Sequence, residues 1–351
     1  MNSTNNTLCP LCGSSTNNTF IIGFDRVSPK KENFTYVKCK ECNLVFLYPL
    51  PTDKEIKTFY DIDYGPHQYG NVDKVNDRHF SFINKFLINN YFHVQSNTTS
   101  KSRLKKYIAK KLSVFALKNL FAPYGKNRLL DVGCGNGLWL YQHLKLGWHA
   151  EGVEMNADAC KKATDLGLNI YQGTIYDVPL TNKYDIITFN HVIEHVLDPL
   201  ETLSQAKKLL APNGLIVMLL PNIDSYGFKK FSNCWFPLDP PRHIIQFSPE
   251  TIRHLIDKVG LNVKDIHTIP KARFMIKSRI YKKYLSNDFI NINDLTKRRT
   301  LIEECLKKGK KQTFESKIYK KIMIFYSYFL NKNSGEILKV TAQNNETSSN
   351  M

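Results

Sequence analysis

The chain has 351 residues, of which 42% are hydrophobic, and its 49 Lys and Arg against 31 Asp and Glu give a formal net charge of +18. This length suits one large domain with an appended module, and the apolar fraction excludes a wholly disordered chain. No run of about eighteen apolar residues occurs, so no transmembrane helix is predicted. The polar segment Met1–Thr7 contains no apolar signal core, and we therefore expect a cytoplasmic protein.

Two Cys-x-x-Cys pairs lie near the N-terminus. Disulfides are disfavoured in a cytoplasmic protein, whereas four thiolates are the number that a tetrahedral structural zinc needs. Gly13 and Asn43 follow the two pairs and tolerate positive φ, which lets the chain curl around the sulfurs. We predict a zinc-ribbon module over residues 1–50, with strands at 20–23 and 34–38. Its zinc is structural, because no coordination position stays open, and the predicted ligands are Cys9, Cys12, Cys39 and Cys42.

Residues 51–122 are predicted to form a linker and a helical lid. Thr52 is suited to cap a helix over Asp53–Tyr60, and a tyrosine-rich loop follows. Further along, apolar residues between Leu104 and Phe115 recur at helical spacing opposite lysines. Such a basic amphipathic helix is typical of a membrane-surface segment and also of a lid packed on the core, which we favour.

Most of the positive charge lies in residues 101–128 and 271–332. This charge indicates attraction to an anionic partner (nucleic acid, a phospholipid surface or a phosphorylated glycan), or else a lysine-rich composition spread over solvated faces. Both interpretations stay open, and with them peripheral membrane contact through the basic segments.

A short apolar run that ends in an acid is followed by three glycines at alternate positions: Asp131, Gly133, Gly135 and Gly137. Glycines between a strand and a helix, here Leu138–Lys145, let the backbone turn tightly and approach a ligand. Dinucleotide-binding folds use G-x-G-x-x-G, with pyrophosphate at the helix N-terminus. The D-x-G-x-G-x-G spacing differs from that pattern and indicates another kind of ligand.

Strands and helices then alternate, which predicts a parallel sheet covered on both faces. The strand His149–Val153 ends at Glu154, about twenty residues after the glycine loop, where doubly wound folds place an acid on ribose hydroxyls. Asp177 and Val178 follow a later strand and suit the amine and the flat face of adenine. The other predicted elements are Asn156–Leu166 and Pro249–Val259 as helices, and Leu168–Tyr171, Tyr184–Phe189, Leu215–Leu220, Leu261–His267 and Glu336–Ala342 as strands.

With these motifs, residues 131–267 resemble the class I S-adenosylmethionine-dependent methyltransferases, including the ubiquinone-biosynthesis O-methyltransferases. The resemblance implies an α/β, Rossmann-like core of seven strands, the last antiparallel, over residues 123–270. A basic helical insertion would follow at 271–332, the last core strand at 333–342 and a disordered tail at 343–351. It implies that S-adenosylmethionine is bound by the four residues of the glycine motif, by Glu154 at the ribose, by Asp177 and Val178 at the adenine, and by Asn190, His191 and Val192 beside the sulfonium.

The flanks extend the resemblance. A four-cysteine ribbon, the segment 49–52, a tyrosine-rich loop and the segment from Pro221 to Ser248 look like bacterial methyltransferases found with surface-polysaccharide synthesis. We therefore expect methyl transfer to a hydroxyl or carbon of a sugar, glycan or related small metabolite. An RNA methyltransferase that uses the ribbon and the basic surface is the alternative. A non-catalytic binding protein that keeps the fold is a further alternative.

The segment His191–His195 fits the H-x-x-E-H pattern of some zinc peptidases, but its place after a buried strand follows the methyltransferase order. Two interpretations beyond the peptidase stay open: His191, Glu194 and His195 bind a divalent cation that orients the acceptor, or Glu194 and His195 brace the loop, which we favour. The candidate general bases are His191, His195 and His243.

The segment Asp239–Arg242 is similar to the D-P-P-aromatic motif of amino-directed nucleic-acid methyltransferases, which stack that aromatic on a flipped base. Arg242 replaces the aromatic, so nucleic acid is disfavoured as the partner. Arg242 and His243 then either contact an anionic or hydroxyl-bearing acceptor, or form a lid in which Arg242 pairs with Asp239.

Overall fold

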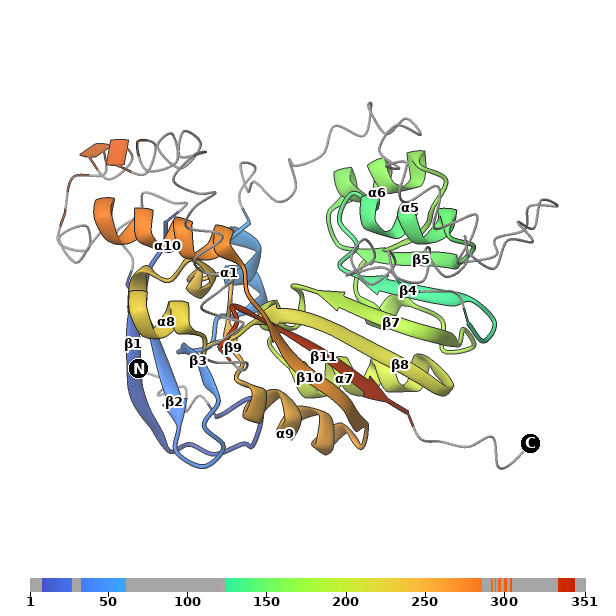
Figure 1. Cartoon of the computed structure of the whole chain (residues 1–351), viewed down its shortest axis with the longest axis horizontal. Helices are drawn as coiled ribbons and strands as arrows, with labels where there is room; N and C mark the ends of the chain where they lie inside the picture. The colour runs from blue at the N-terminus through green and yellow to red at the C-terminus, as the bar shows by residue number, and fades with distance from the viewer. Residues whose placement is uncertain are drawn as a thin grey trace, which may run out of the picture. The chain divides into compact units, whose positions relative to one another are not determined.

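The computed structural model describes residues 8–26, 33–60, 121, 124–285 and 334–344, with single positions between 292 and 304 (Figure 1). The chain divides into two compact units: a first unit with residues up to 64, 190–207 and 217–343, and a second with residues 65–189, 208–216 and 344–351. The helical lid beyond residue 60, the amphipathic helix from Leu104, most of the insertion beyond residue 285 and residues 345–351 of the tail lie outside the described residues. The predicted start of the disordered tail at Gln343 is wrong, because Gln343 is the last residue of a strand.

The N-terminal cysteine region belongs to a four-stranded antiparallel sheet in the first unit. Its strands are β1 (Asn17–Phe24), β2 (Asn33–Cys39), β3 (Val45–Tyr48) and β9 (Ile245–Gln246), in that order across the sheet. Sequence analysis located β1 and β2 but neither β3 nor β9. Strand β9 comes from a distant part of the chain, and Gln246 pairs with Val45. The cysteine region and the segment around residue 245 are therefore parts of one sheet.

Helix α1 (Asp53–Thr58) follows this sheet and confirms the predicted cap at Thr52. The Thr52 hydroxyl accepts a hydrogen bond from the Glu55 amide, and the Glu55 carboxylate accepts one from the Thr52 amide. This reciprocal capping satisfies backbone donors that have no partner inside the helix. The helix ends two residues earlier than predicted.

The second sheet has seven strands in the order β10-β11-β8-β7-β4-β5-β6. Strand β4 pairs in parallel with β5 and β7, and β5 pairs in parallel with β6, whereas β10 and β11 are antiparallel. This arrangement confirms the α/β, Rossmann-like fold and the antiparallel final hairpin. The strands are β4 (Arg128–Val132), β5 (His149–Glu154), β6 (Asn169–Gln172), β7 (Tyr184–Asn190), β8 (Leu210–Pro221), β10 (Asn262–Ile269) and β11 (Ile337–Gln343).

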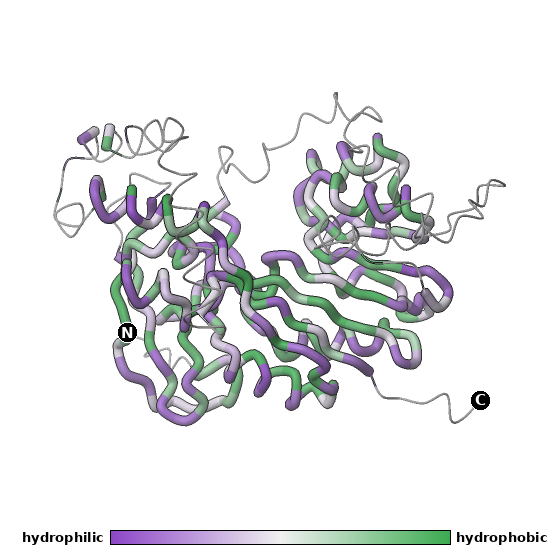
Figure 2. The backbone as a smooth tube through the Cα atoms, viewed as in Figure 1, coloured by the Kyte–Doolittle hydropathy of each residue, from purple (hydrophilic) through white to green (hydrophobic). Residues whose placement is uncertain are grey.

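Strand β8 starts at Leu210, five residues before its predicted start at Leu215. The predicted turn is nonetheless real, because Asn213 has a φ of 59°. The strand is mostly hydrophobic along its length, as the green tube in Figure 2 shows, and it contributes to both compact units.

The described helices after α1 are α5 (Leu138–Lys145), α6 (Ala157–Asp165), α7 (Pro199–Leu209), α8 (Tyr226–Phe231), α9 (Pro249–Val259) and α10 (Ala272–Tyr284). Helices α8 and α10 contact each other, and Phe228 of α8 stacks on Phe20 of β1. Helix α9 shows why the bounds of a helix can be predicted from local sequence. Its amide at Thr251 donates to the Ser248 hydroxyl, its apolar side chains recur on one buried face, and Gly260 ends it at a φ of 72°. No helix within the described part of the chain is long and apolar enough to span a bilayer.

Candidate functional site

The glycine motif lies in the second unit, where it connects β4 to α5. Gly133, Gly135 and Gly137 have φ values of 70°, 56° and 74°, in the left-handed region that side chains with a Cβ rarely adopt. A Cβ at Gly135 would meet no protein atom within 4 Å, whereas one at Gly137 would lie 2.5 Å from a methyl of Leu168. Gly135 therefore borders open space, and Gly137 permits close packing of the helix.

Two acids fix this loop. Asp131 is 2% exposed, and its carboxylate accepts a hydrogen bond from the Thr188 hydroxyl at 2.6 Å. Glu154 is 8% exposed, and its carboxylate accepts hydrogen bonds from the amides of Gly135 at 2.9 Å and Asn156 at 2.8 Å. The end of β5 and the glycine loop are thus joined through one carboxylate.

Asp177 and Val178 differ in their exposure to solvent. The Asp177 carboxylate is exposed and accepts hydrogen bonds from the amide and hydroxyl of Thr174, which lower its pKa. Val178 is 2% exposed as a whole residue, and its amide donates to the carbonyl of Ile175. Sequence analysis missed Met155, which follows Glu154 directly and is 66% exposed. Its signal was a large apolar side chain immediately after a strand end.

Asn190 and His191 belong to the first unit. Asn190 ends β7, and His191 follows it with a φ of 58°, an uncommon conformation for a residue with a Cβ. The His191 amide donates to the carbonyl of Leu219 at 2.8 Å, and its ring nitrogen Nδ1 lies 3.1 Å from the Glu194 carboxylate. The left-handed residue turns the chain directly after the strand.

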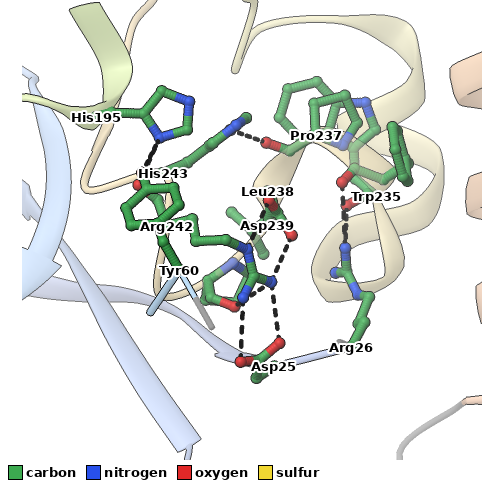
Figure 3. A network of polar contacts seen from close by, with 12 residues as sticks. Asp25, Arg26, Tyr60, His195, Trp235, Pro237, Leu238, Asp239, Arg242 and His243 are labelled. Carbon is green, nitrogen blue, oxygen red and sulfur yellow. Dashed lines mark hydrogen bonds and ion pairs between the residues drawn. The ribbon is translucent and has the colours of Figure 1, made fainter. Parts of the chain in front are cut away.

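Two further imidazoles lie against each other in the first unit. The rings of His195 and His243 are perpendicular, with centroids 4.6 Å apart. Nδ1 of His195 donates to the carbonyl of Arg242 at 2.9 Å, and Nδ1 of His243 donates to the carbonyl of Pro237 at 2.7 Å (Figure 3). Burial, together with the nearby His195, lowers the pKa of His243 to about 4. The structure thus brings all three candidate bases into one unit, two of them in direct contact.

Glu194 lies beside these rings and is 1% exposed. Burial acts to raise the pKa of its carboxyl, but the hydrogen bond from His191 and the positive potential of His191, His195 and His243 lower it to about 2. Its second oxygen, Oε2, is buried and has no hydrogen-bond partner among the described residues. Such an atom in a buried carboxylate is costly unless another group satisfies it.

Arg242 is a structural residue of this region, as Figure 3 shows. It is 2% exposed, and its guanidinium pairs with both carboxylate oxygens of Asp25 at 2.9 and 3.2 Å and with Asp239 at 2.8 and 3.1 Å. The pairing of Arg242 with Asp239 is therefore confirmed. A direct contact of Arg242 with an acceptor is disfavoured, because its guanidinium N–H groups already donate to the buried Asp25 and to the partly exposed Asp239. Sequence analysis missed Asp25 altogether.

The neighbouring Arg26 supports the same loop, and Tyr60 adds a contact to the imidazoles. The Arg26 guanidinium donates to the carbonyls of Trp235 and Asn233. The Tyr60 hydroxyl lies 2.9 Å from Nδ1 of His195. The sequence showed Tyr60 only as the start of a tyrosine-rich loop.

The four predicted ligand cysteines lie together. Their sulfurs are all within 4.8 Å of one another, and the pairs Cys9–Cys42 and Cys12–Cys39 are 3.5 Å apart. Gly13 and Asn43 have φ values of 77° and 64°, as the knuckle prediction required, and their amides donate to the carbonyls of Cys9 and Cys39.

Residues 101–266 match a family model described as a methyltransferase domain. A ubiquinone biosynthesis O-methyltransferase of Ruegeria sp. is 27% identical over 188 residues, which are 50% of this chain and 74% of that protein. The enzyme of the same name from Cereibacter sphaeroides is 29% identical over 174 residues, 45% of this chain and 70% of the relative.

Among solved structures, a SAM-dependent methyltransferase of Archaeoglobus fulgidus aligns with a TM-score of 0.41 at 18% identity, covering 68% of this chain and 94% of the other. The family match, the curated relatives and the glycine loop with its acid on the next strand agree. The chain therefore carries a class I S-adenosylmethionine-dependent methyltransferase domain, and the protein is a methyltransferase.

Proposed function

We propose that this enzyme methylates a hydroxyl oxygen of a sugar, glycan or related small metabolite. The observation that carries the proposal is the imidazole cluster of His191, His195 and His243 beside a buried carboxylate. O-Methylation requires removal of the hydroxyl proton, and imidazole is the side chain best suited to accept one near neutral pH. The curated relatives, which are named O-methyltransferases, support oxygen as the acceptor atom.

The cofactor supplies an activated methyl group, so the chain has mainly to bind and align the reactants. The residues of the glycine motif and Glu154 fit this cofactor. Gly135 leaves space that a Cβ would fill, and the Glu154 carboxylate at the end of β5 retains acceptor capacity for a ribose diol. We assign the methionine end to Asp131 and the glycines, the ribose to Glu154, and the adenine to Asp177, Val178 and the exposed Met155.

Nucleic acid is a poor fit to the Asp239–Arg242 segment. The segment is held by Arg242 inside a buried ion pair with Asp25, so it offers no aromatic surface to a flipped base. This observation disfavours base methylation and leaves small hydroxylated acceptors as the proposal. Methylation of RNA or of a sugar carbon is an outcome that the acceptor assay below can return.

The N-terminal cysteines are proposed to bind a structural zinc ion. Sulfur atoms on a tetrahedral zinc lie about 3.8 Å apart, because each Zn–S bond is about 2.3 Å. The two printed sulfur pairs at 3.5 Å are close to that value, and the four thiolates leave no open position. The zinc would fix the two knuckles that β1, β2 and β3 connect.

A binding experiment tests the cofactor assignment. Glu154→Gln removes one charged acceptor from the ligand, and hydrogen bonds to charged groups contribute about 1.5–3 kcal/mol, which corresponds to roughly a 10- to 150-fold rise in Kd for S-adenosylmethionine. The control is Glu151→Gln, which changes an acid on the same strand that accepts from Arg128 and Tyr184. Calorimetry should show an unchanged Kd for the control, and equal effects of the two variants would refute the assignment.

The acceptor is tested by transfer of a labelled methyl group to fractionated glycans, nucleotide sugars, lipids and RNA. We expect label in an alkali-stable methyl ether of the sugar fractions. Label confined to RNA, or to a carbon atom, would overturn the proposed acceptor while leaving the cofactor assignment intact.

A further inference from the structure

Three side chains of the first unit are arranged as potential ligands of a metal ion. Glu194 and His195 lie in a single turn of 3-10 helix, Ile193–His195, and His243 lies just before β9. One ligand atom from each lies within 4.8 Å of the others. Nitrogen and oxygen ligands on a tetrahedral zinc are about 3.4 Å apart, so the three ligand atoms would move closer together to share one ion.

The tautomers of both histidines suit metal binding. A backbone carbonyl can only accept a hydrogen bond, so the contacts of His195 with Arg242 and of His243 with Pro237 place the ring proton on Nδ1 in each case. Nε2 of each ring then keeps a free lone pair. Histidines that bind metals commonly donate their other ring N–H to a carbonyl or carboxylate in this way.

The buried carboxylate supplies independent support. Oε1 of Glu194 accepts from His191, but Oε2 is buried without a hydrogen-bond partner among the described residues. If Glu194 and His195 only braced the loop, both carboxylate oxygens would be expected to have donors. A cation beside two imidazole lone pairs would satisfy this oxygen and neutralise its charge.

The site is also held rigidly, which metal binding requires. The Ile244 amide donates to the Glu194 carbonyl at 2.9 Å, so the two ligand-bearing segments are joined by a backbone hydrogen bond. The carbonyl that orients His195 belongs to Arg242, whose side chain is fixed by Asp25 and Asp239 (Figure 3).

We propose that Glu194, His195 and His243 form a second metal site that binds a divalent transition-metal ion of the zinc class. Two imidazoles and one carboxylate are a ligand set typical of catalytic zinc and of other borderline metals, and three protein ligands leave open positions. The set differs from the cation site considered from the sequence, because His243 takes the place of His191, which instead donates to Glu194.

The open positions suit an acceptor with two adjacent oxygens, such as a vicinal diol or a hydroxyl beside a carboxylate. This step rests on the proposed function, and in it His195 and His243 act as metal ligands in place of the proton acceptors considered above. An ion held by Glu194, His195 and His243 would supply the Lewis acidity that lowers the pKa of the acceptor hydroxyl, whose proton would pass to solvent. The new O–CH3 bond forms as the sulfonium S–CH3 bond breaks, which gives a methyl ether and S-adenosylhomocysteine.

Metal stoichiometry tests the site without reference to activity. Full-length protein loaded with Zn²⁺ and desalted should contain two metal ions per chain by mass spectrometry. His243→Asn and Glu194→Gln should each retain one, and Cys39→Ser should lose the other. His267→Asn, which removes an exposed histidine paired with Asp265 on β10, is the matched control and should retain two. Thermal unfolding of each variant checks that it is folded.

Cobalt identifies which site is filled. Co²⁺ bound to four thiolates absorbs through sulfur-to-metal charge transfer, and this absorption should persist in His243→Asn while the weaker bands of the second ion disappear. One metal per wild-type chain, unchanged in His243→Asn and Glu194→Gln, would overturn the site. Two metals with methyl transfer that is unaffected by His243→Asn would overturn its role toward the acceptor. Absence of any transfer, with two metals bound, would count against the proposed acceptor alone.

Discussion

Replacing Gly135 by alanine should separate cofactor binding from folding. Gly135 has a φ of 56°, and an added Cβ would meet no protein atom within 4 Å. The left-handed conformation costs an alanine about 1–2 kcal/mol, and no clash inside the protein adds to it. We therefore expect a modest loss of stability, roughly 2–4 °C in Tm per kcal/mol.

The effect on S-adenosylmethionine should be larger. The alanine methyl would project into the space that we assign to the cofactor, and overpacking of this kind costs about 1–3 kcal/mol, which raises the Kd roughly 5- to 150-fold. Gly167→Ala is the matched control. Gly167 lies in the same unit, has a φ of 82°, and likewise has no atom within 4 Å of an added Cβ. It should lose similar stability and bind the cofactor as the parent does.

Calorimetric titration and thermal unfolding of the two variants provide the measurement. Equal affinity of Gly135→Ala and Gly167→Ala for the cofactor would refute the placement of the ligand against the loop. Gly137→Ala offers a contrast, because its Cβ would lie 2.7 Å from that of Ala163 and 2.5 Å from Leu168. Strain and overpacking together should destabilise this variant by about 2–5 kcal/mol.

Two further predictions concern buried charges in the first unit. Burial raises the pKa of Glu336 to about 7 despite hydrogen bonds from Trp235 and Gly227. The folded state therefore binds this proton more tightly than the unfolded state, so stability falls as pH rises from about 4.5 through 7, by about 3 kcal/mol in total. Between pH 5 and pH 8, the free energy of unfolding of Glu336→Gln, measured by denaturant titration, should rise by about 3 kcal/mol relative to that of wild type. A difference between the two proteins that stays constant over this pH range would contradict the burial argument. Arg242→Leu leaves the buried Asp25 and the partly exposed Asp239 without their counter-charge and should cost about 3–5 kcal/mol. The same titrations measure this loss, and a loss below about 1 kcal/mol would show that water already solvates the two acids.

Local chemistry explains which elements could be predicted. The strand–glycine–helix unit from Arg128 to Lys145 and helix α9 were located to within a residue, since caps, glycines and apolar spacing lie within a few residues of one another. The grouping of the four cysteines could be predicted equally well, because the two knuckles are short and each is followed by a residue with positive φ.

The parts that sequence analysis missed depend on contacts between distant segments. Strand β9 has two residues and exists only because β3 pairs with it. Asp25 and Arg242 are 217 residues apart, and no spacing rule joins them. The choice of His243 over His191 as the third member of the Glu194 cluster is likewise a tertiary result, because it depends on where the loop before β9 returns.

These long-range contacts bear on what the cysteine region does. Tyr36 on β2 donates to the His243 carbonyl at 2.7 Å, Asp25 at the end of β1 neutralises Arg242, and β3 pairs with β9. Each contact ends on the segment that carries His243 or orients His195. Removing the N-terminal residues would therefore expose an unpaired strand and leave Arg242 with one acid instead of two. It follows that the cysteine region is a structural part of the imidazole site, and that a metal ion in its knuckles would stabilise the position of His243 from the opposite end of the same sheet.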